Sequence, residues 1–511
     1  MAYISIPDAP QYRAYFPDAA TANGQLLIPH KHAETVILRK LGFTVTSPVT
    51  IKDYDWCGGT PFDIQRKTVE MLIDNPRAYV LSSMGTGKSK SALWAFDMLR
   101  REGAAKRMLI VAPLSTLRFT WAREVLNTIP YLRYQIVHGT KEKRLKLLAE
   151  EADVYIINHD GVRYIADELG RRRDIDVVCI DELATYRNKS QRTEVMVNLA
   201  RQKPIVWGMT GSPTPNSPTD VFWQAKIITP NAVPKYFSHF REQMMLKVTQ
   251  FKWVPKSDAV NRAMNCLQPN VRFTLDDVTE LPEFVSRQQT VGMGAKQAKI
   301  YEDIRKAAFA MAEQKQVTAA NAGAVMSKLL QISLGWVYSS EHGKEPVRLD
   351  GDARVEAMLD TIRAAERKVI VFVPFKHALA GLAEEVNRAG YSCETVSGDT
   401  SATQRAEIFH KFQNTDACDV LLAHPQCVAH GITLTAANTI IWYGPITSLE
   451  IYEQANARIR RVGQKHKQLF LHLQGTAVEK KIYNLLIHKM TVQDALLSML
   501  EDDSWVSMDD N

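Results

Sequence analysis

The stretch Ala78-Tyr-Val-Leu-Ser-Ser-Met-Gly-Thr-Gly-Lys-Ser89 decides the fold. Its first four residues form a short apolar run that predicts a buried strand, and a helical pattern from Ser91 to Leu99 follows. A glycine-containing loop between a strand and a helix is the setting of a phosphate-binding loop, because glycines let backbone N–H groups point at phosphate oxygens. We therefore expect the loop to bind a nucleotide through five residues: Gly85, Thr86, Gly87, Lys88 and Ser89.

Two side chains of this loop have separate expected roles. Lys88 would pair with the β- and γ-phosphates, and the Ser89 hydroxyl would ligate Mg²⁺. The strict form of the motif begins with glycine, whereas this chain has Ser82 at that position. Taken alone, the loop therefore leaves open a simple glycine turn before a helix.

A pair of carboxylates supports the phosphate-loop interpretation. The apolar run Val177-Val-Cys-Ile180 ends in Asp181 and Glu182. In open α/β sheets, ligand-binding groups lie at the carboxyl ends of strands. Asp181 would hold Mg²⁺ through water, and Glu182 would orient or deprotonate the attacking water. A solvated loop is the alternative for the pair alone, but together with the upstream loop it indicates hydrolysis of a nucleoside triphosphate.

Short apolar runs alternate with helical patterns in two regions, which predicts an α/β fold with two parallel sheets. The first sheet has strand candidates at 78–81, 108–112, 154–158, 177–180 and 205–209, and the second at 368–373, 392–396, 420–423, 439–442 and 469–473. The expected organisation is an appendage at 1–60, a first lobe at 61–228, a mainly helical insertion at 229–351, a second lobe at 352–490 and an acidic tail at 491–511.

Composition sets bounds without naming a function. The 511 residues carry a net charge of +7, with 45% hydrophobic and 23% charged residues, which excludes a mainly disordered chain. No apolar run is long enough for a membrane span, and the start does not resemble a signal peptide. Six cysteines without a C-x-x-C pair indicate neither zinc nor disulfides, and Cys179 should be a buried thiol. We expect a cytoplasmic protein.

The second lobe lacks a phosphate loop but contains Gln454-Ala-Asn-Ala-Arg-Ile-Arg-Arg-Val-Gly-Gln464. Arg458 and Arg461 are three residues apart and would share a helix face if the stretch is helical. Arginines from a separate domain can stabilise the charge of a transferred phosphoryl group. A basic helix facing solvent or nucleic acid is the alternative.

The motifs resemble, in order and spacing, those of the Swi/Snf-like branch of superfamily-two helicases, in a compact microbial or phage-type form. The resemblance runs from about Pro61 to Leu500 and implies two RecA-like lobes, ATP and Mg²⁺ as cofactors, and DNA as partner. It assigns Gln65 to adenine recognition and 454–464 to the arginine-finger motif. The resemblance implies a catalytic role for Gln454 and nucleotide binding by Gly431. It implies nucleic-acid contact, or coupling of that contact to hydrolysis, for nine further residues: Pro113 and Ser115 (in the first such motif, followed by Trp121), Asn158 and His159 (in a later one), Thr210 and Ser212, Ser397 and Gly398, and His424.

The chain departs from that family's pattern at the acidic box. The usual Asp-Glu-Ala-His is Asp181-Glu-Leu-Ala184 here. The missing histidine puts in doubt the usual link between the box and the hydroxyls of Thr210 and Ser212. Taken alone, the segment of Thr210 and Ser212 is a Pro/Gly-rich turn.

The expected function is an ATP-dependent DNA translocase or helicase working in recombination, repair or replication on duplex, single-stranded or branched DNA. The alternatives are a strand-separating or annealing helicase, and a nucleotide-gated remodeller that does not translocate. Residues 235–256 interleave bases with aromatics, which indicates either a nucleic-acid contact or a small core under lysines. The tail at 501–511 is either a solvated terminus or a docking segment for a protein partner.

Overall fold

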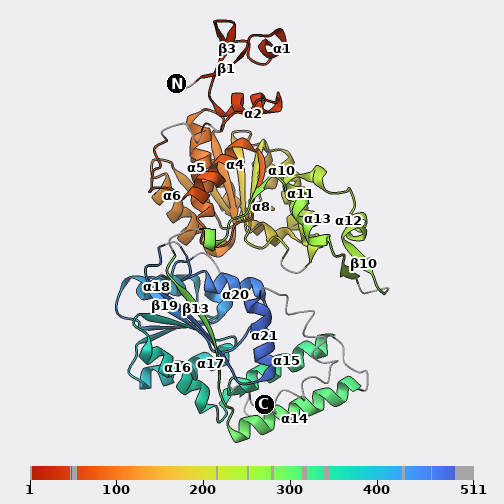
Figure 1. The fold of residues 1–511 in the computed structure, drawn as a ribbon. Helices are drawn as coiled ribbons and strands as arrows, with labels where there is room; N and C mark the ends of the chain where they lie inside the picture. The colour runs from red at the N-terminus through yellow and green to blue at the C-terminus, as the bar shows by residue number, and fades with distance from the viewer. Residues whose placement is uncertain are drawn as a thin grey trace. The chain divides into compact units, whose positions relative to one another are not determined.

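The chain forms two compact units, residues 1–279 and 280–511, which are described separately. The coordinates are a computed structural model (Figure 1). It describes residues 3–46, 48, 54–214, 217–249, 253–277, 281–313, 319–338, 346–428, 432–461 and 463–488. Gly431 and the acidic tail at 491–511 lie outside these residues.

The first unit is built on a seven-stranded sheet in the order β12-β4-β9-β8-β5-β7-β6, and every pairing in it is parallel. The five strands predicted from apolar runs are confirmed. The bounds are β4 Arg77–Val80, β5 Arg107–Ala112, β6 Tyr134–Val137, β7 Val154–Asn158, β8 Ile175–Asp181, β9 Ile205–Met209 and β12 Asn270–Val271.

Both faces of this sheet are buried. Met108 and Ile110 of β5 belong to one hydrophobic cluster, whereas Leu109 and Val111 belong to another. Because successive side chains of a strand point to opposite faces, each face has its own core. The helices are α4 Asp63–Asp74, α5 Lys88–Arg101, α6 Arg123–Thr128, α7 Lys141–Ala149, α8 His159–Val162, α9 Ala166–Arg171, α10 Gln191–Arg201 and α11 Val221–Ile228.

The second unit is built on a six-stranded parallel sheet in the order β13-β20-β19-β16-β18-β17. The strands are β13 Phe284–Thr290, β16 Lys368–Phe372, β17 Cys393–Val396, β18 Val420–Ala423, β19 Ala437–Trp442 and β20 Gln468–Gln474. The helices around it include α16 Asp352–Ala364, α17 Lys376–Arg388, α18 Ala402–Asn414, α20 Leu449–Asn456 and α21 Ala477–Ile487. The predicted α/β fold with two parallel sheets is therefore confirmed.

Residues 229–351, expected to form one insertion, contribute to both units. In the first unit they form an arm, visible at α12 and β10 in Figure 1, and the edge strand β12. The arm comprises α12 Phe237–Met244, β10 Met245–Lys247, β11 Trp253–Pro255 and α13 Ala259–Cys266. In the second unit they form β13, α14 Ala295–Glu313, α15 Ala319–Ser333, β14 Trp336–Tyr338 and β15 Pro346–Arg348.

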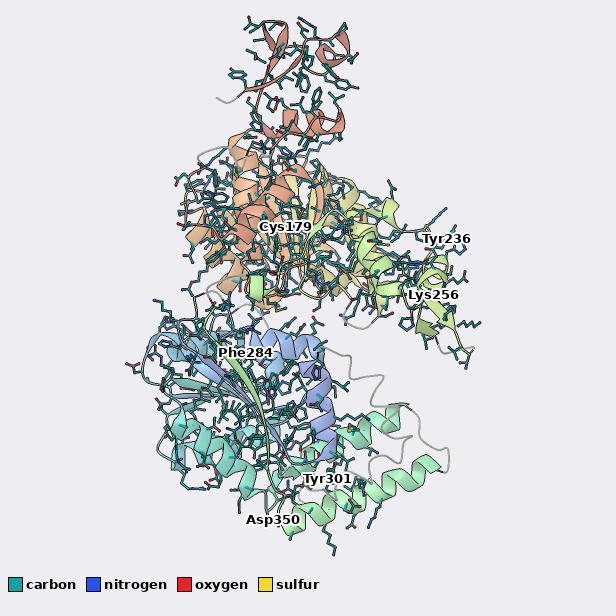
Figure 2. The ribbon with its side chains drawn as sticks, in the orientation of Figure 1. Cys179, Tyr236, Lys256, Phe284, Tyr301 and Asp350 are labelled. Atoms are coloured by element: carbon teal, nitrogen blue, oxygen red, sulfur yellow. The ribbon has the colours of Figure 1, made fainter. Side chains whose placement is uncertain are left out.

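Residues 3–46 form a small sheet and two helices with a core of their own. Strands β1 Tyr3–Pro7 and β2 Ala20–Ala22 both pair antiparallel with β3 Gln25–Pro29. Ile6, Leu26 and Leu38 are buried between this sheet and α2 His32–Lys40. All six cysteines are free thiols in this structure. Cys179 (Figure 2) is buried, as expected. Among the described helices, none has the length and apolarity needed to cross a membrane.

A buried ion pair fastens the second unit. Arg354 of α16 is 2% exposed, and its Nη2 donates to Glu479 Oε2 of α21 at 2.8 Å. The Nη1 atom of Arg354 donates to the carbonyls of Tyr443 at 2.6 Å and Leu473 at 3.2 Å, next to the ends of β19 and β20. The pair therefore joins two helices to two central strands.

We expect Arg354→Met to lower the free energy of unfolding by about 3–5 kcal/mol, because it leaves the Glu479 carboxylate buried without its partner. Arg363→Met is the matched control, since Arg363 is 49% exposed and pairs with Asp360 on the same helix. The control should change stability by less than about 0.5 kcal/mol. Urea unfolding of both variants measures the difference, and equal midpoints would contradict a structural role for the buried pair.

Candidate active site

The loop between β4 and α5 has the backbone that phosphate binding requires. Gly85 and Gly87 have φ of +83° and +81°, in the left-handed region that favours glycine. Gly87 caps the amino end of α5, whose free N–H groups attract anions. A Cβ on Gly87 would lie 2.0 Å from Nε2 of Gln65, so the predicted adenine-recognising glutamine packs directly on the loop. Gln65 is 5% exposed, and its Oε1 accepts from Phe62 N at 3.0 Å.

The side chains of the loop brace it internally. The hydroxyl of Thr86 donates to the Ser83 carbonyl at 2.8 Å, so Thr86 tightens the loop. The Lys88 ammonium lies over the loop and donates to the carbonyls of Ser82 at 2.8 Å and Ser83 at 3.0 Å. Ser89, the predicted Mg²⁺ ligand, is the second residue of α5 and is half-buried.

Ser82, which occupies the position of the motif's first glycine, hydrogen-bonds to a distant segment of the chain. Its hydroxyl accepts from Phe273 N at 3.0 Å, and Ser83 N donates to the Phe273 carbonyl at 2.7 Å. The segment after β12 therefore fixes the start of the loop. Sequence reasoning missed this contact, because Phe273 is 191 positions from Ser82 and carries no local signal.

Asp181 ends β8 at the same edge of the sheet as the loop. Val80 pairs with Met209, and Met209 pairs with Asp181, so the ends of β4, β9 and β8 lie side by side. Trp121 Nε1 donates to Asp181 Oδ2 at 2.9 Å, and Glu182 N donates to Oδ1 at 3.1 Å. Burial raises the pKa of Asp181, while the Trp121 hydrogen bond and the charge of Lys88 act in the opposite direction.

Trp121 belongs to the motif that the resemblance assigns to nucleic-acid contact, yet its side chain is fully buried. It lies in the π-helical segment Leu117–Ala122, which continues from the turn Leu114–Thr116 after β5. Pro113 and Ser115 precede it, and Ser115 is exposed. This segment therefore presents Ser115 outward and Trp121 inward, toward the Asp181 carboxylate.

The second carboxylate of the pair, Glu182, has a φ of +50°, which is uncommon for a residue with a side chain. The chain therefore turns sharply after Asp181.

Asn158 and His159, the second predicted nucleic-acid motif, are both buried. Asn158 Oδ1 accepts from Arg144 Nη2 at 3.1 Å. His159 Nδ1 lies 3.0 Å from the hydroxyl of Tyr186, which follows the carboxylate pair on the chain. Burial lowers the pKa of His159 to about 3, so its ring is neutral. The pair of His159 and Tyr186 joins the end of β7 to the segment after Glu182.

Thr210 and Ser212 follow β9 and lie beside the carboxylates through the strand register. Thr210 is 2% exposed, and its hydroxyl accepts from Ser212 N at 3.4 Å. Thr210 N donates to the Val80 carbonyl at 3.1 Å, which ties this turn to the start of the phosphate loop.

In the second unit, Arg458 and Arg461 converge on one carbonyl. Helix α20 ends at Asn456, so the shared helix face that their spacing suggested does not form. The Nη1 atoms of Arg458 and Arg461 nevertheless donate to the Ile432 carbonyl at 3.2 and 2.9 Å. Gln454, in the last turn of α20, is 1% exposed.

The other predicted residues of this unit lie at the carboxyl edge of its sheet. Ser397 and Gly398 form the turn after β17, where Ser397 N donates to the Thr400 hydroxyl at 3.0 Å. His424 follows β18 and its Nε2 lies 3.0 Å from the Pro374 carbonyl. Burial lowers the pKa of His424.

The arm at 235–256 combines a core with an exposed basic surface. Phe240 is 1% exposed and packs on Phe222. By contrast, Tyr236 (Figure 2) is 56% exposed. The Arg241 guanidinium stacks 4.3 Å above the Trp253 ring. The segment therefore contains the small core of one interpretation and also the exposed aromatic and basic side chains that the nucleic-acid interpretation requires.

The residues at this edge of the sheet fit a magnesium ion whose ligands come mainly from the phosphates of a bound nucleotide. Among the described residues, no group of three or more histidine, cysteine or acidic side chains is gathered to hold a metal ion. One hydroxyl, Ser89, and one half-buried carboxylate, Asp181, are what a phosphate-bound Mg²⁺ needs from a protein, since this ion keeps several waters and phosphate oxygens as ligands.

The chain is similar to known proteins over most of its length. The SNF2-related domain matches residues 65–335, and the helicase conserved C-terminal domain matches residues 353–463. Protein p41 of Acyrthosiphon pisum secondary endosymbiont phage 1 is 24% identical, over 86% of this chain and 99% of the phage protein. The SWI/SNF-related matrix-associated actin-dependent regulator of chromatin subfamily A-like protein 1 of Xenopus tropicalis is 22% identical, over 80% of this chain and 42% of that protein. This chain thus spans less than half of the Xenopus relative.

Among solved structures, the Sulfolobus solfataricus SWI2/SNF2 ATPase core in complex with dsDNA is similar at a TM-score of 0.42 and 20% identity. The similarity covers 91% of this chain and 97% of the Sulfolobus chain.

We expect Gly87→Ala to weaken binding of a fluorescent ATP analogue at least about tenfold, which corresponds to 1.4 kcal/mol. The new Cβ would meet the Gln65 amide at 2.0 Å and force the loop or the glutamine to move. Gly103→Ala is the control, because Gly103 has a similar φ of +75° but open space around it. The control shares the backbone strain, so equal affinities of the two variants would show that the packing of Gln65 on the loop is irrelevant to nucleotide binding.

Proposed function

We propose that this chain, which belongs to the SNF2-related family, is an ATP-driven motor that moves along duplex or branched DNA in recombination, repair or replication. Membership of this family, with a helicase C-terminal domain, makes it an ATP hydrolase of the helicase and translocase class. The observation that carries the proposal is the register of β4, β9 and β8, because it brings the phosphate loop and the Asp181 carboxylate to one edge of the sheet.

In this proposal, the first unit binds and activates the nucleotide. Lys88 leaves the loop carbonyls to pair with the β- and γ-phosphates, and Gln65 contacts the adenine. Ser89 and Asp181 hold Mg²⁺, which when bound would neutralise phosphate charge. Glu182 is the group that orients the attacking water, since it follows the metal-binding carboxylate at the strand end.

The second unit supplies the arginines in this proposal. Arg458 and Arg461 already share the Ile432 carbonyl as acceptor, so their guanidinium groups are held close together. Planar guanidinium groups can pair with two phosphate oxygens at once, which suits them to stabilise the charge on the transferred phosphoryl group.

DNA as the track rests on two kinds of support. The helicase C-terminal domain belongs to a class of enzymes that act on nucleic acids, and the Xenopus relative is named as a regulator of chromatin. The test compares ATPase stimulation by duplex, single-stranded and forked DNA and by RNA at one stated salt concentration. ATP-dependent displacement of a triplex strand then separates a translocase from a strand-separating helicase and from a remodeller that does not move. A chain that no nucleic acid stimulates would refute the proposal.

We expect Arg461→Ala to reduce ATP turnover by about 10³-fold or more while nucleotide binding is largely kept, because an arginine finger acts on the transition state. Lys88→Ala should lose both turnover and tight nucleotide binding, since it removes the cation of the phosphate loop. Single-turnover ATPase measurements and equilibrium binding of a nucleotide analogue separate the two effects. If Arg461→Ala loses nucleotide binding to the same degree as Lys88→Ala, Arg461 is a binding residue and not a finger.

We expect Trp121→Phe to raise the Mg²⁺ concentration for half-maximal ATPase rate by about tenfold or more. The variant keeps most of the buried ring but removes the N–H that orients the Asp181 carboxylate, and loss of such supporting partners costs about 10–100-fold in metal affinity or activity. Trp94→Phe is the control, because that indole is equally buried and donates at 2.9 Å to the Cys57 carbonyl instead. An unchanged Mg²⁺ requirement in Trp121→Phe would mean that Trp121 serves only packing.

A further inference from the structure

We propose that the acidic segment 501–511 of this chain binds along the free edge of β13 and adds a strand to the six-stranded sheet of the second unit. This contact is independent of the proposed DNA track, because it concerns how the chain covers a surface of its own. All the described residues that form the surface belong to the second unit.

Strand β13 has one paired side and one unpaired side. It pairs with β20 over all seven of its residues, and among the described strands none pairs with its other side. The Glu283 carbonyl accepts from Gln468 N at 2.9 Å, and Val291 N donates to the Gln474 carbonyl at 2.8 Å. Because backbone groups alternate in direction along a strand, the odd-numbered residues face β20. The residues that direct their N–H and C=O groups to the unpaired side are therefore Phe284, Ser286, Gln288 and Thr290.

This strand lacks most of the devices that protect a sheet edge from a further strand. Such edges are usually short, bulged, or interrupted by proline or charge. Strand β13 is seven residues long, keeps an even register with β20 and contains no proline. Val285 is 47% exposed, and Ser286 is exposed as well. The one charged residue of the strand is the exposed Arg287, which would repel a basic segment and attract an acidic one.

Further cations border the start of the strand. The Arg460 guanidinium lies 4.4 Å above the ring of Phe284 (Figure 2), the first residue of β13. Lys467 is 81% exposed and pairs at 2.7 Å with Glu283, the acidic residue just before the strand. Together with Arg287, these groups make the edge complementary to an acidic occupant. Because Arg460 lies between the two predicted finger arginines on the chain, such an occupant would also border that motif.

The chain leaves the described part of the second unit beside this edge. Gln288 Nε2 donates to Asn484 Oδ1 of α21 at 2.9 Å, so the last turns of that helix lie against β13 (Figure 1). Lys481 is exposed three positions before Asn484 and shares its helix face. Helix α21 ends at Ile487, and residues 489–511 follow in the sequence.

The acidic segment has the composition and the reach to occupy the edge. In Glu501-Asp-Asp-Ser-Trp-Val-Ser-Met-Asp-Asp-Asn511, acidic residues flank a short stretch that contains Trp505 and Val506, two residue types that favour strands. Residues 489–500 span up to about 40 Å when extended, whereas β13 is about 23 Å long at about 3.3 Å per residue. A short tether keeps a segment at a local concentration of about 1 mM, which favours the chain's own segment over that of a second copy.

The test uses the full chain and three substitutions. Val506→Pro removes an N–H from the segment and disfavours its pairing as a strand. Ser286→Pro removes an outward N–H from β13 but no bond to β20, and edge strands tolerate proline at such positions. Thr395→Pro is the matched control at the opposite edge of the same sheet. The carbonyls of Ser392 and Val396 accept from β18 and from the residue after it, so Thr395 of β17 also faces away from its neighbour.

Hydrogen exchange of single amides, resolved by mass spectrometry, reads out the occupied edge. We expect the amides of Gln288 and Thr290 to exchange about tenfold more slowly in the unaltered chain than in Val506→Pro, because a segment at about 1 mM local concentration fills a site of about 100 μM affinity nine-tenths of the time. The amides of Arg287 and Gln289 face β20 and should exchange equally in both. Equal exchange of Gln288 and Thr290 in the two chains would overturn the proposal. Protection that rises with protein concentration would overturn it too, since the occupant would then be the segment of a second copy.

A labelled peptide with the sequence of residues 501–511 gives a second measurement. It should bind the Val506→Pro chain about tenfold more tightly than the unaltered chain, whose own segment competes for the edge. Addition of Ser286→Pro to the Val506→Pro chain should abolish this gain, and addition of Thr395→Pro should keep it. Should Ser286→Pro fail to fold, Arg287→Glu in the same chain reverses the charge of the edge and should also abolish the gain. Peptide affinity that is indifferent to both β13 substitutions would refute binding at this edge.

Discussion

The parallel register of β4, β9 and β8 is the constraint on which the candidate active site depends. It sets Val80, Met209 and Asp181 side by side, so the phosphate loop, the Thr210 turn and the carboxylate emerge at one edge of the sheet. Burial at the end of β8 disfavours the ionised form of Asp181 and raises its pKa. The N–H groups of Trp121 and Glu182 and the charge of Lys88 act in the opposite direction without cancelling that rise. The site is therefore a half-buried carboxylate oriented by a few donors, and a cation that arrives with phosphates would favour its ionised form.

The sequence predicted the central strands and the edge strand β17, but missed the edge strands β6, β12 and β13. Runs such as Val177-Val-Cys-Ile180 are continuously apolar because both of their faces are covered by helices. Strand β6 (Tyr134-Gln-Ile-Val137) and strand β13 (Phe284-Val-Ser-Arg-Gln-Gln-Thr290) each pair with only one neighbour. Each of these two edge strands carries polar or half-exposed residues, so its sequence shows no clear apolar run. Its place depends on the neighbouring strand, which local patterns do not encode.

The candidate site also has parts that the local sequence predicts and parts that only the fold reveals. The phosphate loop and the carboxylate pair were predictable because each is a contiguous motif with a chemical reason for its spacing. The groups that support them come from distant segments: Phe273 holds Ser82, Trp121 holds Asp181, and Tyr186 meets His159. Arg144 lies between the lysines of α7, and only the fold shows that it is buried. Charge counted along the chain cannot separate such a residue from a solvated one.

The π-helical segment Leu117–Ala122 links an exposed cation to the edge of the sheet that carries the Asp181 carboxylate. Trp121 points inward and donates to Asp181, whereas Arg118, three positions earlier, is exposed. π-Helical turns are rare, and they are frequent at functional sites. One short turn therefore carries both the donor that orients the carboxylate and a cation at the surface. The motif's residue types alone do not predict this placement, because it depends on the local helix geometry that the fold imposes.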